Sequence, residues 1–284
     1  MGIFSKLSRL ATAAVAWAVL SAALSATGAA EPWAGIEEAP VRLIAGQTAV
    51  GDGDRVLLAV QIRLKPGWKT YWRNPGESGG PPQFDWSGSD NLAEARALWP
   101  APKRFESFGF VSFGYQDELV LPIAVTPRSG GQTLKARLRL DYLICERICI
   151  PVNADLRLTL DPGAARPSAH GALIGRYLAR VPKSGGDAPF RIEAAKVSGP
   201  AGEQVLEVTA RADQAFENPD MMVEAPSPFG FGRPAISYQE DRRLLTMRLP
   251  VYPGPGKAAL SKHSLTLTLV DGARASETRI TLGD

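Results

Sequence analysis

Cys145 and Cys149 are the only two cysteines in this 284-residue chain, and three residues separate them. A pair of thiols so close in sequence can serve as a structural disulfide, as part of a metal site, or as a redox-active dithiol that exchanges with other thiols. The thiolate is the reactive form both in exchange and in metal binding. The spacing alone therefore leaves three hypotheses open.

Elementary chemistry weighs the three hypotheses differently. A structural disulfide across so small a loop removes only about 2 kcal/mol of unfolded-state entropy, although disulfides are common in exported proteins. Structural zinc takes four ligands, and the only histidines, His170 and His263, are distant in sequence, so no metal site is predicted. A small ring strains a disulfide and makes it easier to reduce. Thiol-disulfide exchange is therefore the favoured hypothesis, and a structural disulfide remains the alternative.

The flanking residues predict where the two thiols lie. Apolar and polar residues alternate over 134–144 and again over 152–160. This pattern is typical of two half-buried strands joined as a β-hairpin. Cys145 and Cys149 share the parity of the polar positions, so both sulfurs are expected to leave the core face, to be able to pair, and to be accessible.

The N-terminal residues resemble an export signal. Lys6 and Arg9 precede an apolar run over 10–24, and small residues follow as far as Ala30. This order predicts a signal peptide over 1–30, cleaved near Ala30, because the run is short for a membrane span; an uncleaved anchor is the alternative. No later stretch is long and apolar enough to cross a bilayer. An exported, soluble protein in an oxidising compartment is expected.

The composition narrows the class of protein. The net charge is +3 without any basic run, so neither nucleic acid nor an anionic membrane surface is expected as a partner. The 28 glycines and 23 prolines are spread without a repeat, as in proteins of many short strands. The predicted fold is all-β: a first β domain over 31–162 that carries the cysteine hairpin, a helical connector over 163–188, and a second β-sandwich, of immunoglobulin type, over 189–284.

Two segments are rich in aromatic residues. Residues 68–73 are expected to contribute to a core, although a carbohydrate-binding face is an alternative, formed by Trp68, Tyr71, Trp72 and Trp86. Residues 99–115 interleave aromatic residues with Gly and Ser. That segment fits either a mobile loop that covers a reactive site or a buried irregular strand.

Several motifs in the first domain together resemble a known family. They are Pro66–Gly76, Trp99-Pro100, Phe108-Gly109-Phe110, Gly114-Tyr115 and Cys145–Pro151. In this order they resemble the N-terminal periplasmic domain of DsbD, the bacterial thiol:disulfide interchange protein, and more closely its ScsB-like variant. The resemblance implies an immunoglobulin-like domain whose cysteine pair receives electrons from a membrane partner and passes them to periplasmic thioredoxin-like proteins.

The resemblance also implies roles for individual residues. Cys145 and Cys149 would be the exchanging pair, with Cys149 forming the mixed disulfide with a partner. Phe108, Gly109 and Phe110 fall where the family has a cap loop over the disulfide. Glu106 and Tyr71 are candidate modulators of the thiols. No cofactor is implied.

One departure bears on the partners. Full-length relatives continue into a membrane domain, whereas this chain ends at Asp284. The expected electron donor is therefore a separate membrane thiol reductase of the CcdA or DsbD type, unless the relay has been lost, and the expected clients are thioredoxin-fold proteins. The predicted activity is that of a protein-disulfide oxidoreductase. The alternative is a non-catalytic exported binding module with a structural disulfide.

Overall fold

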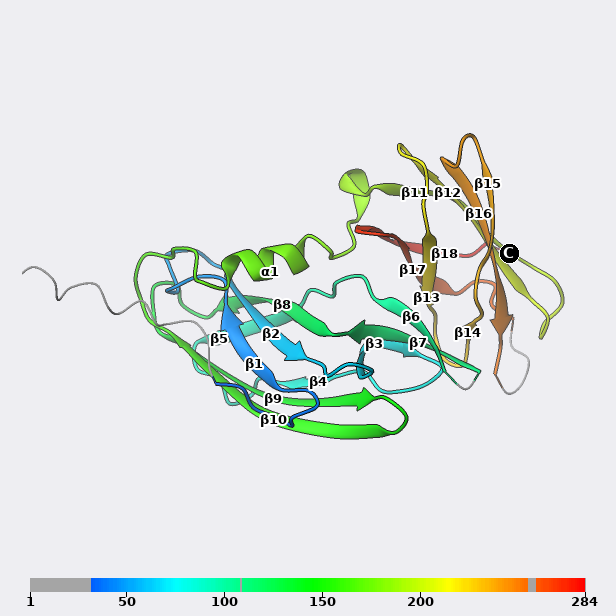
Figure 1. Ribbon diagram of the computed structural model, residues 1–284. Helices are drawn as coiled ribbons and strands as arrows, with labels where there is room; N and C mark the ends of the chain where they lie inside the picture. Colours follow the sequence, from blue (N-terminus) through cyan, green and yellow to red (C-terminus); the bar gives the residue numbers. More distant parts are fainter. Residues whose placement is uncertain (1–31, 108, 255–258, 284) are drawn as a thin grey trace, which may run out of the picture.

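The computed structural model describes residues 32–107, 109–254 and 259–283, and within them the chain forms two β-sandwiches (Figure 1). The first sandwich pairs a four-stranded sheet with a six-stranded sheet. The four-stranded sheet has the order β1 (Val41–Ala45), β2 (Val56–Arg63), β8 (Glu118–Pro127), β5 (Leu92–Ala97). The six-stranded sheet has the order β10 (Cys149–Leu160), β9 (Leu134–Cys145), β3 (Lys69–Gly76), β7 (Phe110–Gln116), β6 (Lys103–Ser107), and β4 (Gln83–Asp85) also pairs with β9.

The second sandwich follows the helix α1 (Gly171–Leu178) and the short 3-10 turn η1 (Gly185–Asp187). One sheet contains β11 (Phe190–Ser198), β12 (Val205–Ala212), β16 (Leu244–Tyr252) and β14 (Gly230–Phe231), with β15 (Ala235–Gln239) beside β16. The other contains β13 (Pro219–Glu224), β17 (Ser264–Asp271) and β18 (Arg274–Thr281). All the strand pairings are antiparallel, and the predicted all-β fold with one short helix between two sandwiches is confirmed.

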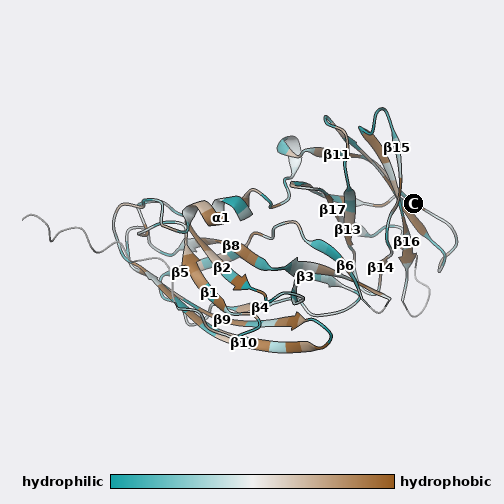
Figure 2. Ribbon diagram, viewed as in Figure 1, coloured by the Kyte–Doolittle hydropathy of each residue, from teal (hydrophilic) through white to brown (hydrophobic). Residues whose placement is uncertain are grey.

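Alternating polarity forms the sheets, because successive side chains of a strand point to opposite faces. Along β9 the even-numbered residues from Leu134 to Ile144 are all buried, and the odd-numbered ones between them are mostly exposed. The same alternation runs along β10, and Figure 2 shows it as hydrophobic and hydrophilic bands. The core between the two sheets includes Trp72, which is fully buried.

The helix α1 does more than join the two sandwiches. Ile174 and Tyr177 pack against Ile44, Ala59 and Val120 on the outer face of the four-stranded sheet. The apolar spacing of the predicted helix therefore matches a face that is buried. No helix within the described residues is long and apolar enough to span a membrane.

The second sandwich lies against β3, β6 and β7 of the first. Met222 of β13 belongs to the core cluster of the first sandwich. Arg104 of β6 donates to both carboxylate oxygens of Asp220, from Nε at 2.9 Å and from Nη2 at 2.9 Å. Arg73 of β3 pairs with Glu224 at 2.6 Å and also with Glu277. Arginines of β3 and of β6, the strand that precedes the predicted cap loop, thus form ion pairs with the second sandwich.

Candidate functional site

The cysteine hairpin places the two thiols opposite each other. β9 and β10 are antiparallel, and Cys149 is the register partner of Cys145 at the end of the ladder. Glu146, Arg147 and Ile148 form the loop, which is closed by a hydrogen bond from Glu146 N to Ile148 O at 3.2 Å. The two cysteines are joined in a disulfide with a Cα–Cα distance of 4.1 Å.

The two sulfurs differ in exposure, which corrects the sequence-based expectation that both are accessible. Cys145 is only 3% exposed, whereas Cys149 is exposed. The alternation of apolar and polar residues over 134–144 correctly predicted that Cys145 lies on the outer face of β9. That face is covered at this end of the sheet, because Tyr71 of β3 lies over it. Cys149 is therefore the sulfur that an incoming thiol can reach.

Tyr71 is the closest polar contact of the disulfide. Its hydroxyl donates to Cys145 Sγ at 2.8 Å and lies 3.8 Å from Cys149 Sγ. Burial raises the pKa of Tyr71, so the phenol stays protonated and can donate. The loop after β3 closes over the ring at Gly79, whose φ is +97°, and a Cβ there would lie 2.1 Å from Tyr71 Cε1. The sequence analysis missed Gly79, although the Gly-Gly-Pro-Pro run at 79–82 marks a special loop.

Lys69 is a second residue that the sequence analysis missed. It is the register partner of Cys145 on β3 and is 9% exposed. Its Nζ donates to Ser112 Oγ at 3.1 Å and to Ser107 Oγ at 3.5 Å, and burial lowers its pKa. The feature of the sequence that could have identified Lys69 is the presence of a lysine within the aromatic-rich residues 68–73.

The predicted cap segment is the tip of a regular β-hairpin, so residues 99–115 are not a long mobile loop. β6 ends at Ser107 and β7 begins at Phe110, with Gly109 at φ +82° in the turn. Phe113 of β7 is buried, while Phe110 at the tip is 55% exposed. Phe108, the predicted capping residue, lies outside the described residues. The structure thus brings Ser107 near Lys69, and the capping role stays a prediction.

Comparisons with known proteins identify the family of the first sandwich. Residues 41–161 match the family model for the N-terminal domain of the thiol:disulfide interchange protein DsbD. The first sandwich is a DsbD-type N-terminal domain. The chain is also similar to the crystal structure of the N-terminal periplasmic domain of ScsB from Proteus mirabilis, with 25% sequence identity and a TM-score of 0.73.

That similarity covers 91% of this chain and 100% of the ScsB domain, so it extends over both sandwiches. Residues 180–284 match a domain of unknown function, DUF8393. No curated protein matches the chain. The DsbD-type domain and its disulfide place the first sandwich in the thiol-disulfide interchange family.

Glu106 does not contact the disulfide of the DsbD-type domain. Its carboxylate accepts from Arg233 Nη1 of the second sandwich at 3.2 Å. The neighbouring residues of β6, Phe105 and Ser107, are the ones that face Lys69. An influence of Glu106 on the thiols therefore stays a prediction that no contact supports, whereas Tyr71 touches the sulfur.

The aromatic residues of 68–73 do not form an exposed carbohydrate-binding face. Trp72 is fully buried, and Tyr71 is 2% exposed beside the disulfide. Trp68 and Trp86 are partly buried against the core of the DsbD-type domain. Among the described residues there is also no group of three or more His, Cys, Asp or Glu side chains that could hold a metal ion.

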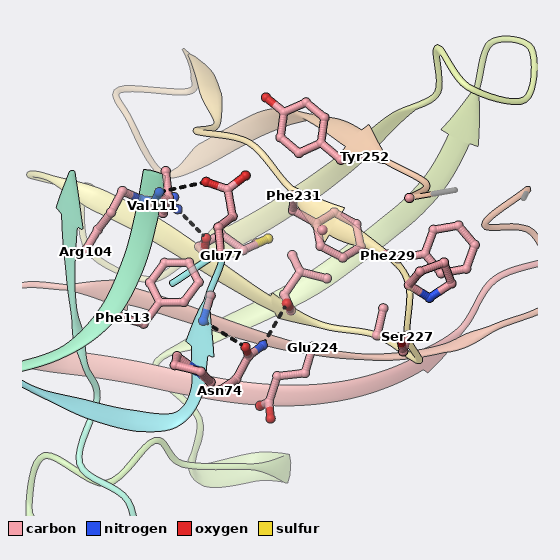
Figure 3. A pocket seen from close by; sticks show the side chains of 18 of the residues that line it. Asn74, Glu77, Arg104, Val111, Phe113, Glu224, Ser227, Phe229, Phe231 and Tyr252 are labelled. Carbon is pink, nitrogen blue, oxygen red and sulfur yellow. Dashed lines mark hydrogen bonds between the residues drawn. The ribbon is translucent and has the colours of Figure 1, made fainter. Parts of the chain in front are cut away.

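A cavity of about 620 Å³ lies between the two sandwiches, beside the cap hairpin (Figure 3). Phe113 of the DsbD-type domain and three aromatic residues of the second sandwich line it, namely Phe229, Phe231 and Tyr252. Glu77 and Val111 form its rim and are joined by two hydrogen bonds, from Val111 N to Glu77 Oε2 at 2.7 Å and from Glu77 N to Val111 O at 2.8 Å. Neither cysteine lines this cavity, so it is distinct from the disulfide site.

Proposed function

We propose that this protein is a periplasmic thiol-disulfide interchange protein that relays electrons through Cys145 and Cys149. The observation that carries the proposal is the asymmetry of the disulfide: Cys149 is exposed, while Cys145 is buried and hydrogen-bonded to Tyr71. Exchange depends on which sulfur can be attacked and on how well the other sulfur leaves. In this DsbD-type domain one sulfur of the disulfide is accessible to attack, and the other accepts a hydrogen bond that favours its departure. This arrangement favours thiol-disulfide exchange.

Reduction of the disulfide begins at Cys149. A donor thiolate attacks the Sγ atom of Cys149, a donor–Cys149 disulfide forms, and the Cys145–Cys149 bond breaks. The electron pair of the broken bond stays on Cys145 as a thiolate. The second thiolate of the donor then attacks the donor sulfur, which releases Cys149 and leaves the donor oxidised by two electrons.

Delivery to a client reverses these roles. The Cys149 thiolate attacks a client disulfide and forms a mixed disulfide, and one client sulfur leaves as a thiolate. Cys145 then attacks Cys149 Sγ, which regenerates the internal disulfide and releases the second client thiolate. The register of β9 and β10 favours this second step, because it holds the two cysteines directly opposite each other.

Tyr71 acts on both steps. Its hydroxyl lies 2.8 Å from Cys145 Sγ and donates to the thiolate that forms there. Hydrogen bonds to a charged group favour the charged form. Tyr71 thereby assists the departure of Cys145 during reduction and holds its sulfur in place for the attack on Cys149.

The partners follow from the exchange chemistry and from the family. The donor is proposed to be a membrane thiol reductase of the CcdA or DsbD type, and the clients are proposed to be thioredoxin-fold proteins. The ScsB domain that this chain resembles is described as periplasmic. The predicted signal peptide over 1–30 supports the same compartment and lies outside the described residues.

The reduction potential of the Cys145–Cys149 pair tests the proposal. The full chain without its predicted signal peptide is equilibrated in thiol buffers, and free thiols are counted after alkylation. A potential well above about −300 mV, among exchange proteins, supports the relay. A potential below about −300 mV identifies a disulfide that stays closed, and the non-catalytic binding module then becomes the better function.

A further inference from the structure

Lys69 is buried without a negatively charged partner. The residue is 9% exposed, and its Nζ donates only to the hydroxyls of Ser112 and Ser107, at 3.1 Å and 3.5 Å. No carboxylate of the described residues lies within ion-pair distance of it, and burial alone lowers its pKa. An ammonium group that is desolvated in this way costs free energy unless it is paired. The rings of Phe105 and Tyr71, with centroids 5.3 Å and 6.0 Å from Nζ, are further neighbours of the ammonium, and neither carries a negative charge.

Lys69 is next to the buried sulfur. It lies opposite Cys145 in the ladder between β3 and β9. Residues directly opposite each other in an antiparallel pair share a face, with their Cβ atoms about 5 Å apart. Tyr71 contacts both groups: its hydroxyl donates to Cys145 Sγ at 2.8 Å, and its ring centroid lies 6.0 Å from Lys69 Nζ.

The acidic groups on the surrounding elements are engaged elsewhere or exposed. Glu106 of β6 pairs with Arg233, and Glu77 after β3 accepts from the Val111 N–H. Glu146 and Arg147 in the hairpin loop are exposed. Among the described residues, Lys69 is the only lysine, arginine or histidine in the buried class. Within that part of the chain it is therefore the one buried, positively charged residue that is the register partner of Cys145, and its Nζ lies at the hydroxyls of Ser112 and Ser107 in the β6–β7 hairpin.

We infer that Lys69 is a positioning residue that stabilises the thiolate of Cys145 when the disulfide opens, an inference that rests on the exchange proposed above. The attacking thiolate forms a bond to Cys149 Sγ, and the electron pair of the Cys145–Cys149 bond remains on Cys145. The sulfur of Cys145 is neutral before this step and carries one negative charge after it. The ammonium of Lys69 thus gains its partner only during the reaction.

The consequence is a better leaving group. A thiol with a lower pKa leaves faster and forms a less basic thiolate. Burial in apolar surroundings by itself raises the pKa of a thiol, and a nearby lysine lowers it. Lys69 and the Tyr71 hydroxyl together offset the burial of Cys145, which allows this sulfur to be both shielded and reactive.

Two substitutions in the full chain test the inference. Lys69→Met removes the charge, and Lys69→Arg keeps it. The pKa of the Cys145 thiol is measured from thiolate absorbance in a Cys149→Ser background, where Cys145 is the only thiol. We expect Lys69→Met to raise that pKa by about one unit, a tenfold loss of thiolate, and Lys69→Arg to stay close to the native value.

The same two variants with both cysteines present give a kinetic readout. Dithiothreitol should reduce the disulfide about tenfold more slowly in Lys69→Met, and the reduction potential should fall by about 30 mV, which corresponds to a tenfold change for a two-electron couple. Both measurements use a small thiol only. They therefore test Lys69 independently of whether the protein exchanges with thioredoxin-fold partners.

A double variant, Ser107→Ala with Ser112→Ala, is the matched control. It removes the hydroxyls that hold the lysine to the cap hairpin but retains the ammonium group. We expect this variant to keep the native pKa of Cys145. The inference is wrong if the double variant reproduces the effect of Lys69→Met, if Lys69→Met leaves that pKa unchanged, or if Lys69→Arg behaves like Lys69→Met.

Discussion

Each sandwich contains a buried charged residue, Lys69 in the first and Asp271 in the second, and the two residues differ in their partners. In the second sandwich Asp271 is 3% exposed and accepts from Asn218 N at 2.7 Å, from Glu217 N at 3.1 Å and from Arg274. In the first sandwich Lys69 is 9% exposed, and its ammonium has two serine hydroxyls and two aromatic rings as neighbours but no carboxylate among the described residues. A buried charge with all its partners present serves the fold. A buried charge that lacks its partner marks the place where chemistry supplies one.

Both sandwiches otherwise have an apolar interior with a few buried polar residues. In the second sandwich Phe190 and Phe216 stack with ring centroids 5.2 Å apart, and Gln204, Thr268 and Ser276 are buried. In the first sandwich Gln61, Thr70 and Ser112 are buried. Ser112 accepts from the Lys69 ammonium, whereas Thr70 donates to Leu143 O. The two sandwiches therefore differ in how a buried charge is paired and not in how many polar residues they bury.

The largest expected effect comes from the exposed sulfur. Cys149→Ser should abolish electron transfer to any thioredoxin-fold client, because Cys149 is the accessible sulfur that forms the mixed disulfide. The measurement is client reduction followed by thiol alkylation. Cys145→Ser is the matched variant, and it should instead accumulate a stable mixed disulfide through Cys149, visible on a non-reducing gel. Equal behaviour of the two variants would contradict the proposed asymmetry.

The next effect is on stability and compares the two buried charges directly. Asp271→Asn should lower the free energy of unfolding by about 3 kcal/mol, because it breaks a buried ion pair and leaves Arg274 without its partner. Lys69→Met should leave the free energy of unfolding unchanged or increase it, because it removes an unpaired buried charge. Denaturant unfolding of the oxidised proteins measures both. A large loss in Lys69→Met would mean that Lys69 serves the fold.

A smaller loss is expected at the contact between the sandwiches. Arg104 is only 7% exposed at its side chain, and it donates to Asp220 and to Met221 O. Arg104→Met should lower the free energy of unfolding by about 2 kcal/mol, since it leaves a hydrogen-bonded carboxylate without its charged donor. The reduction potential should stay unchanged, because Arg104 has no contact with the sulfurs. A shifted potential would show that the second sandwich affects the disulfide through the β6–β7 hairpin.

Tyr71→Phe should have a modest effect confined to the first sandwich. It removes one hydrogen bond to Cys145 Sγ, worth about 1 kcal/mol, so reduction by dithiothreitol should slow about fivefold. The ring that fills the space under Gly79 remains, and the thermal unfolding temperature should change little. Tyr177→Phe on α1 is a suitable control, because its hydroxyl contacts Glu118 instead of a sulfur. An equal slowing in both variants would contradict the role of Tyr71.

The smallest effect is expected on partner docking. Ile148 is 68% exposed in the loop next to Cys149, and an exposed apolar side chain beside a reactive sulfur suits a protein partner. Ile148→Asp should slow exchange with a thioredoxin-fold client a few-fold and leave reduction by dithiothreitol unchanged. Tyr252→Asp, at an exposed apolar position of the second sandwich, is the control. An equal effect of Tyr252→Asp would show that the partner also contacts the second sandwich.

Local sequence patterns were sufficient for the architecture. The alternation of apolar and polar residues over 134–144 and 152–160 predicts the cysteine hairpin, because a strand with one buried face needs that period. The same pattern in residues 206–282 predicts the second sandwich, and the apolar spacing around Ile174 and Tyr177 predicts the helix. The helix is shorter than the predicted helical connector over 163–188, since α1 spans Gly171–Leu178.

Only the tertiary structure distinguishes the two cysteines. Cys145 and Cys149 have the same parity in their strands, so no local pattern can assign one to the interior. The difference arises because Tyr71, 74 residues earlier in the chain, lies over Cys145. The burial of Lys69 likewise depends on β3 pairing with β9 on one side and β7 on the other. Local sequence patterns are enough to specify the strands and the pair of thiols. Which of the two sulfurs is exposed, and which charged residue is buried opposite the other sulfur, was decided by the packing of strands that are distant in sequence. The reason is that burial depends on neighbours that no local pattern specifies.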